Sequence, residues 1–82
     1  MSSRKRKMKA FILIETTPGK AKEVTTALKQ LDEVKLADTV TGPYDVIAIV
    51  EAEDFTVIGH IVAAKINAIV GVSRTIVSAT QK

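Results

Sequence analysis

Two stretches of the chain are apolar at almost every position over the length of a β-strand. They are residues 8–15 and residues 44–50, which contain the uninterrupted apolar runs 10–14 and 46–50. Two further stretches, 34–41 and 72–80, are rich in β-branched residues, which favour extended chain. In the first of these, alternation places Val34, Leu36 and Val40 on one face. The pattern predicts four strands, with a short hairpin turn at Gly42-Pro43 joining the second to the third.

Apolar residues at helical spacing occur twice between these strands. The first helix is predicted to begin at Thr17, as the capping residue, with Pro18 at the first helical position. The second follows Glu53-Asp54, acidic residues that suit the positive end of a helix dipole. The predicted apolar face of the first helix holds Ala21, Val24, Leu28 and Leu31, and that of the second holds Phe55, Ile58, Val62, Ile66 and Ile69.

The resulting order, βαββαβ, predicts an α+β, ferredoxin-like sandwich. Right-handed crossovers place both helices on one face of a four-stranded antiparallel sheet, with strands one and three central. A faint internal repeat supports this order. A shift of 36 residues superimposes residues 11–15 on 47–51 and residues 37–40 on 73–76, as two successive βαβ halves require.

The two central strands are apolar on both faces, although two helices cover only one. In the first strand, Phe11 and Leu13 point to the face opposite that of Ala10, Ile12 and Ile14. In the third strand, Ile47 and Ile49 face opposite to Val46, Ala48 and Val50. Covering four such side chains is worth about 6–12 kcal/mol per chain before the cost of association. A second copy is the simplest cover because a two-fold interface is self-complementary. We therefore expect a homodimer through the sheet face, a dimeric α/β barrel-type assembly.

Composition narrows the class of protein further. The 82 residues allow one domain with a small core, and the absence of cysteine excludes disulfides and thiolate metal sites. No apolar run is long enough to cross a membrane, and no secretory signal follows the basic start, so a cytoplasmic protein is expected.

The net charge of +3 comes from the N-terminus. Residues 1–9 hold five of the twelve basic residues, and the remainder has seven basic against nine acidic residues. We expect a basic flexible tail over residues 1–7 and a single domain over residues 8–82. The tail is either a solubilising leader, which is favoured, or a contact for nucleic acid or a membrane surface.

Residues for catalysis are scarce. His60 lies in the predicted second helix with no second histidine or cysteine to share a metal, so a surface or half-buried helix position is favoured over a ligand or base. Glu51, Glu53 and Asp54 suit either a helix start or a hard cation, and the helix start is favoured. The sequence predicts no catalytic residue, no metal and no cofactor.

The segment Thr41-Gly42-Pro43-Tyr44-Asp45 is the most informative for binding. A free amino acid needs an anion for its ammonium group, which Asp45 offers, and backbone N–H groups for its carboxylate, which the loop around Gly42 offers. The alternative is plain turn chemistry, in which Gly-Pro bends the chain and Asp caps the turn.

Two segments resemble one known family. Residues 40–47 resemble the second hairpin of the effector domain of Lrp/AsnC transcriptional regulators, called the RAM (regulation of amino-acid metabolism) domain. Residues 69–77 resemble its closing strand, where Gly-Val is followed by Arg-Thr. The likeness spans Met8 to Thr80, and it implies the βαββαβ fold, dimerisation through the sheet and assembly of dimers into octamers or related rings.

The resemblance also implies a function. Amino-acid effectors of that family bind near a Gly-x-Tyr-Asp loop, which maps onto Gly42, Tyr44 and Asp45, with Thr41 and Pro43 as neighbours. Full-length members carry an N-terminal helix-turn-helix domain that is not seen here, so DNA binding in the family's mode is not expected. The chain resembles a stand-alone, non-catalytic module that binds a small amino acid or co-assembles with full-length regulators.

Two other functions remain open on the same strand order. One is an ACT-like regulatory domain that acts on an enzyme in trans. The other is a small dimeric monooxygenase with a substrate enclosed between sheet and helices, for which His60 is the sole candidate residue, since fold alone does not decide function.

Overall fold

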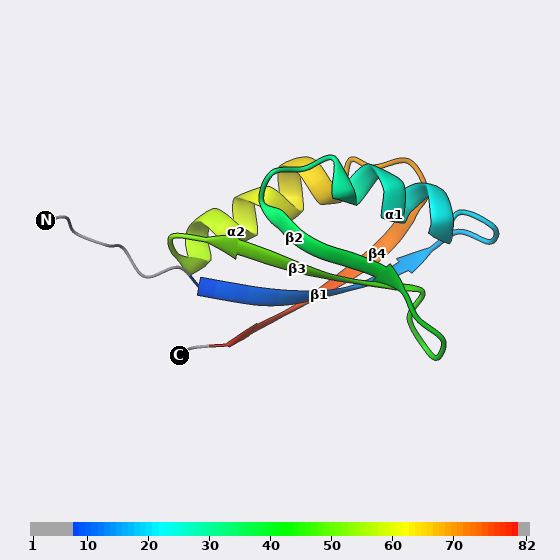
Figure 1. Cartoon of the computed structure of the whole chain (residues 1–82), viewed down its shortest axis with the longest axis horizontal. Coiled ribbons are helices and arrows are strands. Elements are labelled where there is room, and N and C mark those ends of the chain that lie inside the picture. Colours follow the sequence, from blue (N-terminus) through cyan, green and yellow to red (C-terminus); the bar gives the residue numbers. More distant parts are fainter. Residues whose placement is uncertain (1–7, 81–82) are drawn as a thin grey trace, which may run out of the picture.

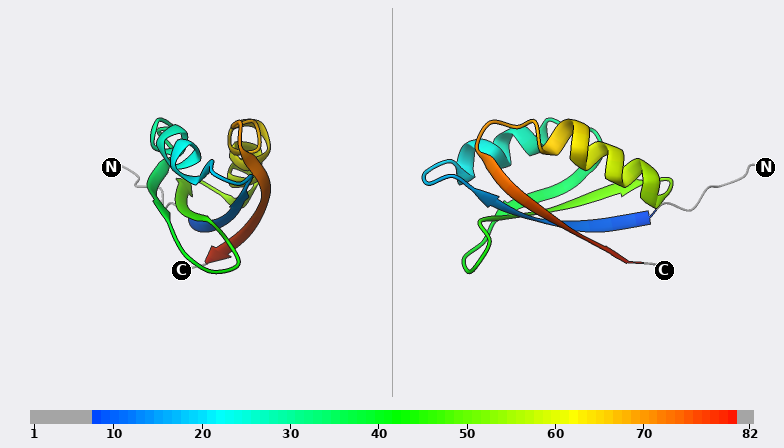
Figure 2. Two further views of the ribbon diagram at one scale, coloured as in Figure 1. Left: turned by 90° about the vertical axis from the view of Figure 1, so that its right-hand side faces the viewer. Right: turned by 180° about the vertical axis from the view of Figure 1, so that it is seen from behind.

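The computed structural model describes residues 8–80. The predicted basic tail, residues 1–7, lies outside the described residues. Within these described residues, two helical segments lie side by side on one face of a four-stranded sheet, and the other face carries no helix (Figures 1 and 2). The elements in chain order are β1 (Met8–Thr16), α1 (Ala21–Lys29), β2 (Val34–Thr39), β3 (Val46–Ala52), α2 (Phe55–Ile61), the π-helical segment η1 (Val62–Ile66) and β4 (Val72–Thr80).

The sheet is antiparallel, with the strand order β2-β3-β1-β4. This confirms the ferredoxin-like fold and the prediction that the first and third strands are central. The register places Leu13 of β1 between Ile47 of β3 and Ile76 of β4. Partners in such a ladder share one face of the sheet, so the register fixes which side chains lie together.

The core lies between the sheet and the helices. The helix-facing residues of the two central strands are buried: Ala10, Ile12 and Ile14 in β1, and Val46, Ala48, Val50 and Ala52 in β3. Val24 and Leu28 of α1 close the core from above, as the helical spacing predicted. Because these side chains are aliphatic and small, the helices pack close to the sheet without aromatic filling.

The predicted start of the first helix is three residues too early, since the cap is Lys20 and not Thr17. Residues 17–20 form a turn in which the Lys20 N–H donates to the Thr17 carbonyl oxygen at 3.1 Å, and Gly19 has a φ of 80°. Proline before a glycine with positive φ is the chemistry of a type II turn, which precedes the helix instead of opening it. The helix begins at Ala21, after Lys20, whose side chain makes no capping hydrogen bond.

The predicted common face for Val34, Leu36 and Val40 is also wrong. The pairing of β2 with β3 shifts between Val34, which lies opposite Val50, and Leu36, which lies opposite Ile49. The extra residue is a β-bulge that turns Val34 towards the helices and Leu36 towards the helix-free face. The strand ends at Thr39, so Val40 belongs to the following loop.

The second helix starts as predicted but does not continue as a regular α-helix. The Asp54 carboxylate accepts a hydrogen bond from the Val57 N–H at 2.9 Å, which caps α2. From Val62 the chain widens into a π-helical turn, in which the Asn67 N–H reaches the Val62 carbonyl oxygen at 2.8 Å. Phe55 was predicted on the apolar face of this helix but is 54% exposed. It occupies the first position of α2, beyond the point where the helix packs on the sheet.

Candidate functional site

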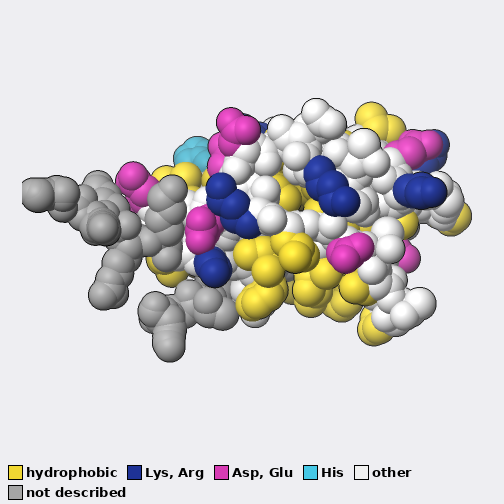
Figure 3. Space-filling view, in the orientation of Figure 1, with side chains coloured by type: hydrophobic (Ala, Val, Ile, Leu, Met, Phe, Trp, Pro, Cys, Tyr) yellow, Lys and Arg dark blue, Asp and Glu magenta, His cyan; other side chains and the backbone are white. Residues whose placement is uncertain are grey.

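The helix-free side of the sheet carries a continuous set of large apolar side chains. We call this the apolar sheet face, and its members come from all four strands: Phe11, Leu13, Leu36, Ile47, Ile49 and Ile76. Phe11 is 38% exposed and Leu36 is 47% exposed. Hydrophobic side chains gather along the underside of the molecule, away from the helices (Figure 3). The two-faced central strands predicted from the sequence are therefore confirmed.

Charged residues border this face at both ends of β1. Lys9 lies opposite Glu51 of β3, and Glu15 lies opposite Arg74 of β4. Each pairing sets a positive residue beside a negative one on the same side of the sheet as Phe11. The apolar sheet face is thus flanked by two pairs of opposite charge at the ends of β1, and Asp38, opposite Ile47, adds a negative charge at its β2 edge.

The β2–β3 loop, residues 40–45, holds the five residues predicted to bind a ligand. Thr41, Gly42 and Pro43 are exposed, whereas Tyr44 and Asp45 are half-buried at its base. Gly42 has a φ of 132°, and no atom lies within 4 Å of the position where a Cβ would be. The loop extends beyond the sheet on the helix-free side (Figures 1 and 2). The structure thus brings the five residues together at one rim of the apolar sheet face.

Asp45 has a structural role that sequence reasoning mentioned only as turn capping. Its carboxylate Oδ2 accepts a hydrogen bond from the backbone N–H of Thr16 at 2.8 Å. Its own N–H donates to the Ile14 carbonyl oxygen at 2.9 Å, and its carbonyl oxygen accepts from the Val40 N–H at 2.9 Å. Asp45 therefore joins the β2–β3 loop to the end of β1, which is distant in sequence.

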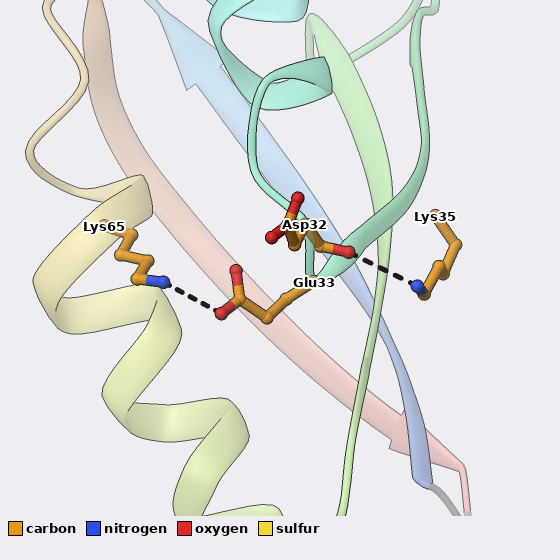
Figure 4. Close-up of polar contacts among 4 residues, drawn as sticks. All are labelled: Asp32, Glu33, Lys35 and Lys65. Atoms are coloured by element: carbon orange, nitrogen blue, oxygen red, sulfur yellow. Dashed lines mark hydrogen bonds and ion pairs between the residues drawn. The ribbon is translucent and has the colours of Figure 1, made fainter.

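One ion pair was not anticipated from the sequence. Lys65 lies on η1, and Glu33 is the residue just before β2. The distance from Lys65 Nζ to Glu33 Oε2 is 2.8 Å (Figure 4). The hydrogen bond and charge of Lys65 lower the pKa of Glu33 below its ordinary value of 4.5. A residue separation of 32 gives no local pattern by which this pair could have been found.

The other candidate residues do not assemble into a centre for chemistry. His60 is exposed on α2, and Asp54 caps that helix, whereas Glu51 lies in β3. Among residues 8–80, no three His, Asp or Glu side chains lie close enough to hold a metal ion. Within the same residues, none of the helices is sufficiently long and apolar to span a bilayer.

Two open grooves lie away from the β2–β3 loop. The larger, of about 420 Å³, follows the outer edge of β2, and the smaller, of about 360 Å³, lies on α1. Neither includes a residue of the segment 41–45. Lys35 and Asp38 line the larger groove, and charged residues on an edge strand discourage pairing with a further strand.

The fold and the exposed loop define a class of small ligand-binding regulatory domain, and comparison with protein families agrees. The model of the Lrp/AsnC ligand binding domain matches residues 9–82. The chain belongs to this family. No curated protein matches the sequence significantly.

Solved structures share the fold at two different lengths. A hypothetical protein, PHS023 from Pyrococcus horikoshii, is 32% identical with a TM-score of 0.85, and the match covers 92% of this chain and 90% of that one. AsnC from E. coli is 24% identical with a TM-score of 0.85, and the transcriptional regulator NMB0573 from Neisseria meningitidis, solved as an L-Met complex, is 22% identical with a TM-score of 0.81. Each match covers 92% of this chain but only 51% and 50% of those regulators.

Proposed function

We propose that this chain is a non-catalytic, cytoplasmic module that binds an amino-acid effector and assembles with copies of itself. The observation that carries the assembly is the apolar sheet face. It joins six large aliphatic or aromatic side chains from four strands, and no other part of residues 8–80 forms a layer over them. A contiguous apolar surface of this kind marks an interaction site on a small protein.

The exposure of individual side chains sets the strength of this argument. Full burial of a large apolar side chain is worth about 1.5–3 kcal/mol. Only Phe11 and Leu36 exceed one-third exposure on this face, at 38% and 47%. Neighbours on the flat sheet shield the rest, so the free energy gained by covering the face is smaller than the 6–12 kcal/mol expected from the sequence. Two-fold symmetry doubles the contribution because each copy buries the same face.

The β2–β3 loop is the proposed contact for the effector, through Thr41, Gly42, Pro43 and Tyr44, with Asp45 at the base of the loop. Its first three residues are exposed, and the backbone at Gly42 adopts a φ of 132°, where a side chain is strained. Backbone N–H groups of such a loop are suited to bind a carboxylate. The L-Met complex of the regulator from N. meningitidis, which shares this fold, supports an amino acid as the ligand class.

The regulatory partner is proposed to be a full-length Lrp/AsnC regulator. The match to AsnC covers about half of that protein with the same fold, and this shared fold supports a mixed assembly. Homodimers formed through the apolar sheet face would associate further, to octamers or similar rings. Mixed assembly would tune the oligomeric state of the regulator without a catalytic step.

Isothermal titration calorimetry with L-methionine and then the other common amino acids tests effector binding. We expect saturable heat from at least one of them, and weaker binding when Gly42 is replaced by alanine. Silence across all of them would remove the effector from the proposal and leave assembly alone. Co-purification with a tagged full-length regulator tests mixed assembly. The native chain should co-purify with the regulator, and a variant with lysine in place of Phe11 and Leu36 should not.

A further inference from the structure

The loops at one end of the sheet are tied together by backbone atoms and one carboxylate. The β2–β3 loop, the β1–α1 turn and the start of β4 all lie at the same end of the molecule (Figure 1). The Thr17 N–H donates to the Gly71 carbonyl oxygen at 2.9 Å, which fixes the turn to the residue before β4. Asp45 makes the corresponding link between the turn and the β2–β3 loop.

The Thr16 N–H needs an acceptor that the sheet does not supply. The last pair of the β1–β3 ladder is Ile14 opposite Val46, and the β1–β4 register shifts between Glu15 and Thr16. β3 begins at Val46, so no residue of β3 lies opposite the part of β1 that follows Ile14. Asp45, the last residue of the loop before β3, occupies this position. The Asp45 carboxylate oxygen, 2.8 Å from the Thr16 nitrogen, takes the place of the missing backbone carbonyl. A half-buried N–H would otherwise lose a hydrogen bond on folding.

Three hydrogen bonds therefore converge on one residue at the base of the loop. The backbone of Asp45 bonds to Ile14 and Val40, and its side chain bonds to Thr16. By contrast, the hydrogen bond that the Asp38 carboxylate accepts within the described part of the chain comes from the adjacent Thr39 N–H, at 3.1 Å. The first arrangement spans 29 residues of sequence and fixes the direction of the loop, whereas the second is local.

We propose that Asp45 is a positioning residue, which holds the loop of residues 41–44 at the rim of the apolar sheet face through Thr16. In this role the carboxylate serves as a hydrogen-bond acceptor for the backbone, and its negative charge is not the partner of an effector's ammonium group. The part of this inference that concerns the effector rests on the function proposed above. The link between Asp45 and Thr16 does not.

Amide hydrogen exchange at Thr16, followed by NMR, tests the link directly. Asp45→Ala removes the acceptor, so the Thr16 amide should exchange at least about tenfold faster. Asp45→Asn keeps a side-chain oxygen in the same place, so exchange should stay within about threefold of the native rate. Asp38→Ala is the matched control, because it also removes an aspartate carboxylate, but one that bonds to the adjacent residue. It should leave the exchange rate of the Thr16 amide unchanged.

The same variants separate a positioning role from a charge partner. In calorimetry with L-methionine, Asp45→Asn should bind within about threefold of the native affinity, and Asp45→Ala at least about tenfold more weakly. If the asparagine variant binds as weakly as the alanine variant while its Thr16 amide stays protected, the charge contacts the effector, and the positioning role is wrong.

Each remaining outcome is also decisive. Unchanged Thr16 exchange in Asp45→Ala would overturn the link itself. If native protein binds no amino acid, the effector proposal fails, but the exchange experiment still decides the role of Asp45. If Asp45→Ala does not fold, the Asp45→Asn variant is used alone. Its Thr16 amide must then exchange at a native-like rate, and faster exchange would contradict the proposal.

Discussion

Replacing Phe11 and Leu36 together by lysine should abolish self-association and leave the fold intact. Both side chains lie on the apolar sheet face, from β1 and β2, and both lie opposite Ile49 of the intervening strand. The exposed fractions of 38% and 47% are the parts of each side chain that a second copy is able to cover. Neither residue belongs to the buried core between sheet and helices.

The magnitude follows from these fractions. At about 1.5–3 kcal/mol for full burial, the two side chains contribute roughly 1.3–2.5 kcal/mol per chain. In a two-fold dimer the contribution doubles to about 2.5–5 kcal/mol, because each variant residue occurs twice. The dissociation constant should rise about 100- to 5,000-fold, before the added repulsion between lysines. Surface substitutions of this kind change folding stability by only about 0.5 kcal/mol each.

Sedimentation equilibrium over a concentration series gives the dissociation constant, and circular dichroism gives the melting temperature. Val70→Lys is the control, because Val70 is 82% exposed and lies in the loop between η1 and β4, on the helix side. It should associate as the native chain does. A double lysine variant with native association and native melting would refute the interface, since it would place the contact elsewhere.

Three further predictions concern the loops and the ion pair. Gly71→Ala should lower stability by about 1–3 kcal/mol in thermal denaturation, because Gly71 has a φ of 105° and its new Cβ would lie 3.0 Å from the Lys20 and Val24 side chains. Gly42→Ala should cost less stability, since nothing lies within 4 Å, but should weaken amino-acid binding about tenfold by changing the loop backbone. Lys65→Met should lower stability by about 0.2–1 kcal/mol at pH 7. Because Lys65 lowers the pKa of Glu33, this difference should be present above the ordinary pKa and vanish as the pH falls through the folded-state pKa, and a constant difference down to pH 2 would contradict it.

The sequence predicted the order and faces of the sheet because periodicity reports burial directly. Residues 8–15 and 44–50 are apolar on both sides, and the structure makes both strands central. The errors lie where one residue changes the pattern. A bulge after Val34 reverses its face relative to Leu36, and the turn at Pro18 and Gly19 delays α1 to Ala21. Bulges and turn types depend on the partner strand and the local backbone, which alternation does not encode.

The candidate site also has a part that the sequence predicted and a part that it did not. Loop chemistry picked out residues 41–45, which the structure brings together at one rim of the sheet. The bond from Asp45 to Thr16 and the pair of Glu33 with Lys65 join residues about 30 positions apart. Such contacts depend on how the strands and helices meet, so no spacing rule could reveal them, and the bond from Asp45 to Thr16 is the basis of the positioning role proposed above.

The mass of the native chain in solution tests the central claim most directly. Light scattering coupled to size-exclusion chromatography at micromolar concentration should give a particle of at least two 8.8 kDa copies, with a larger even multiple where dimers associate further. A particle of 8.8 kDa that persists to the highest soluble concentration would contradict the account, because the apolar sheet face would then remain open to water without a partner.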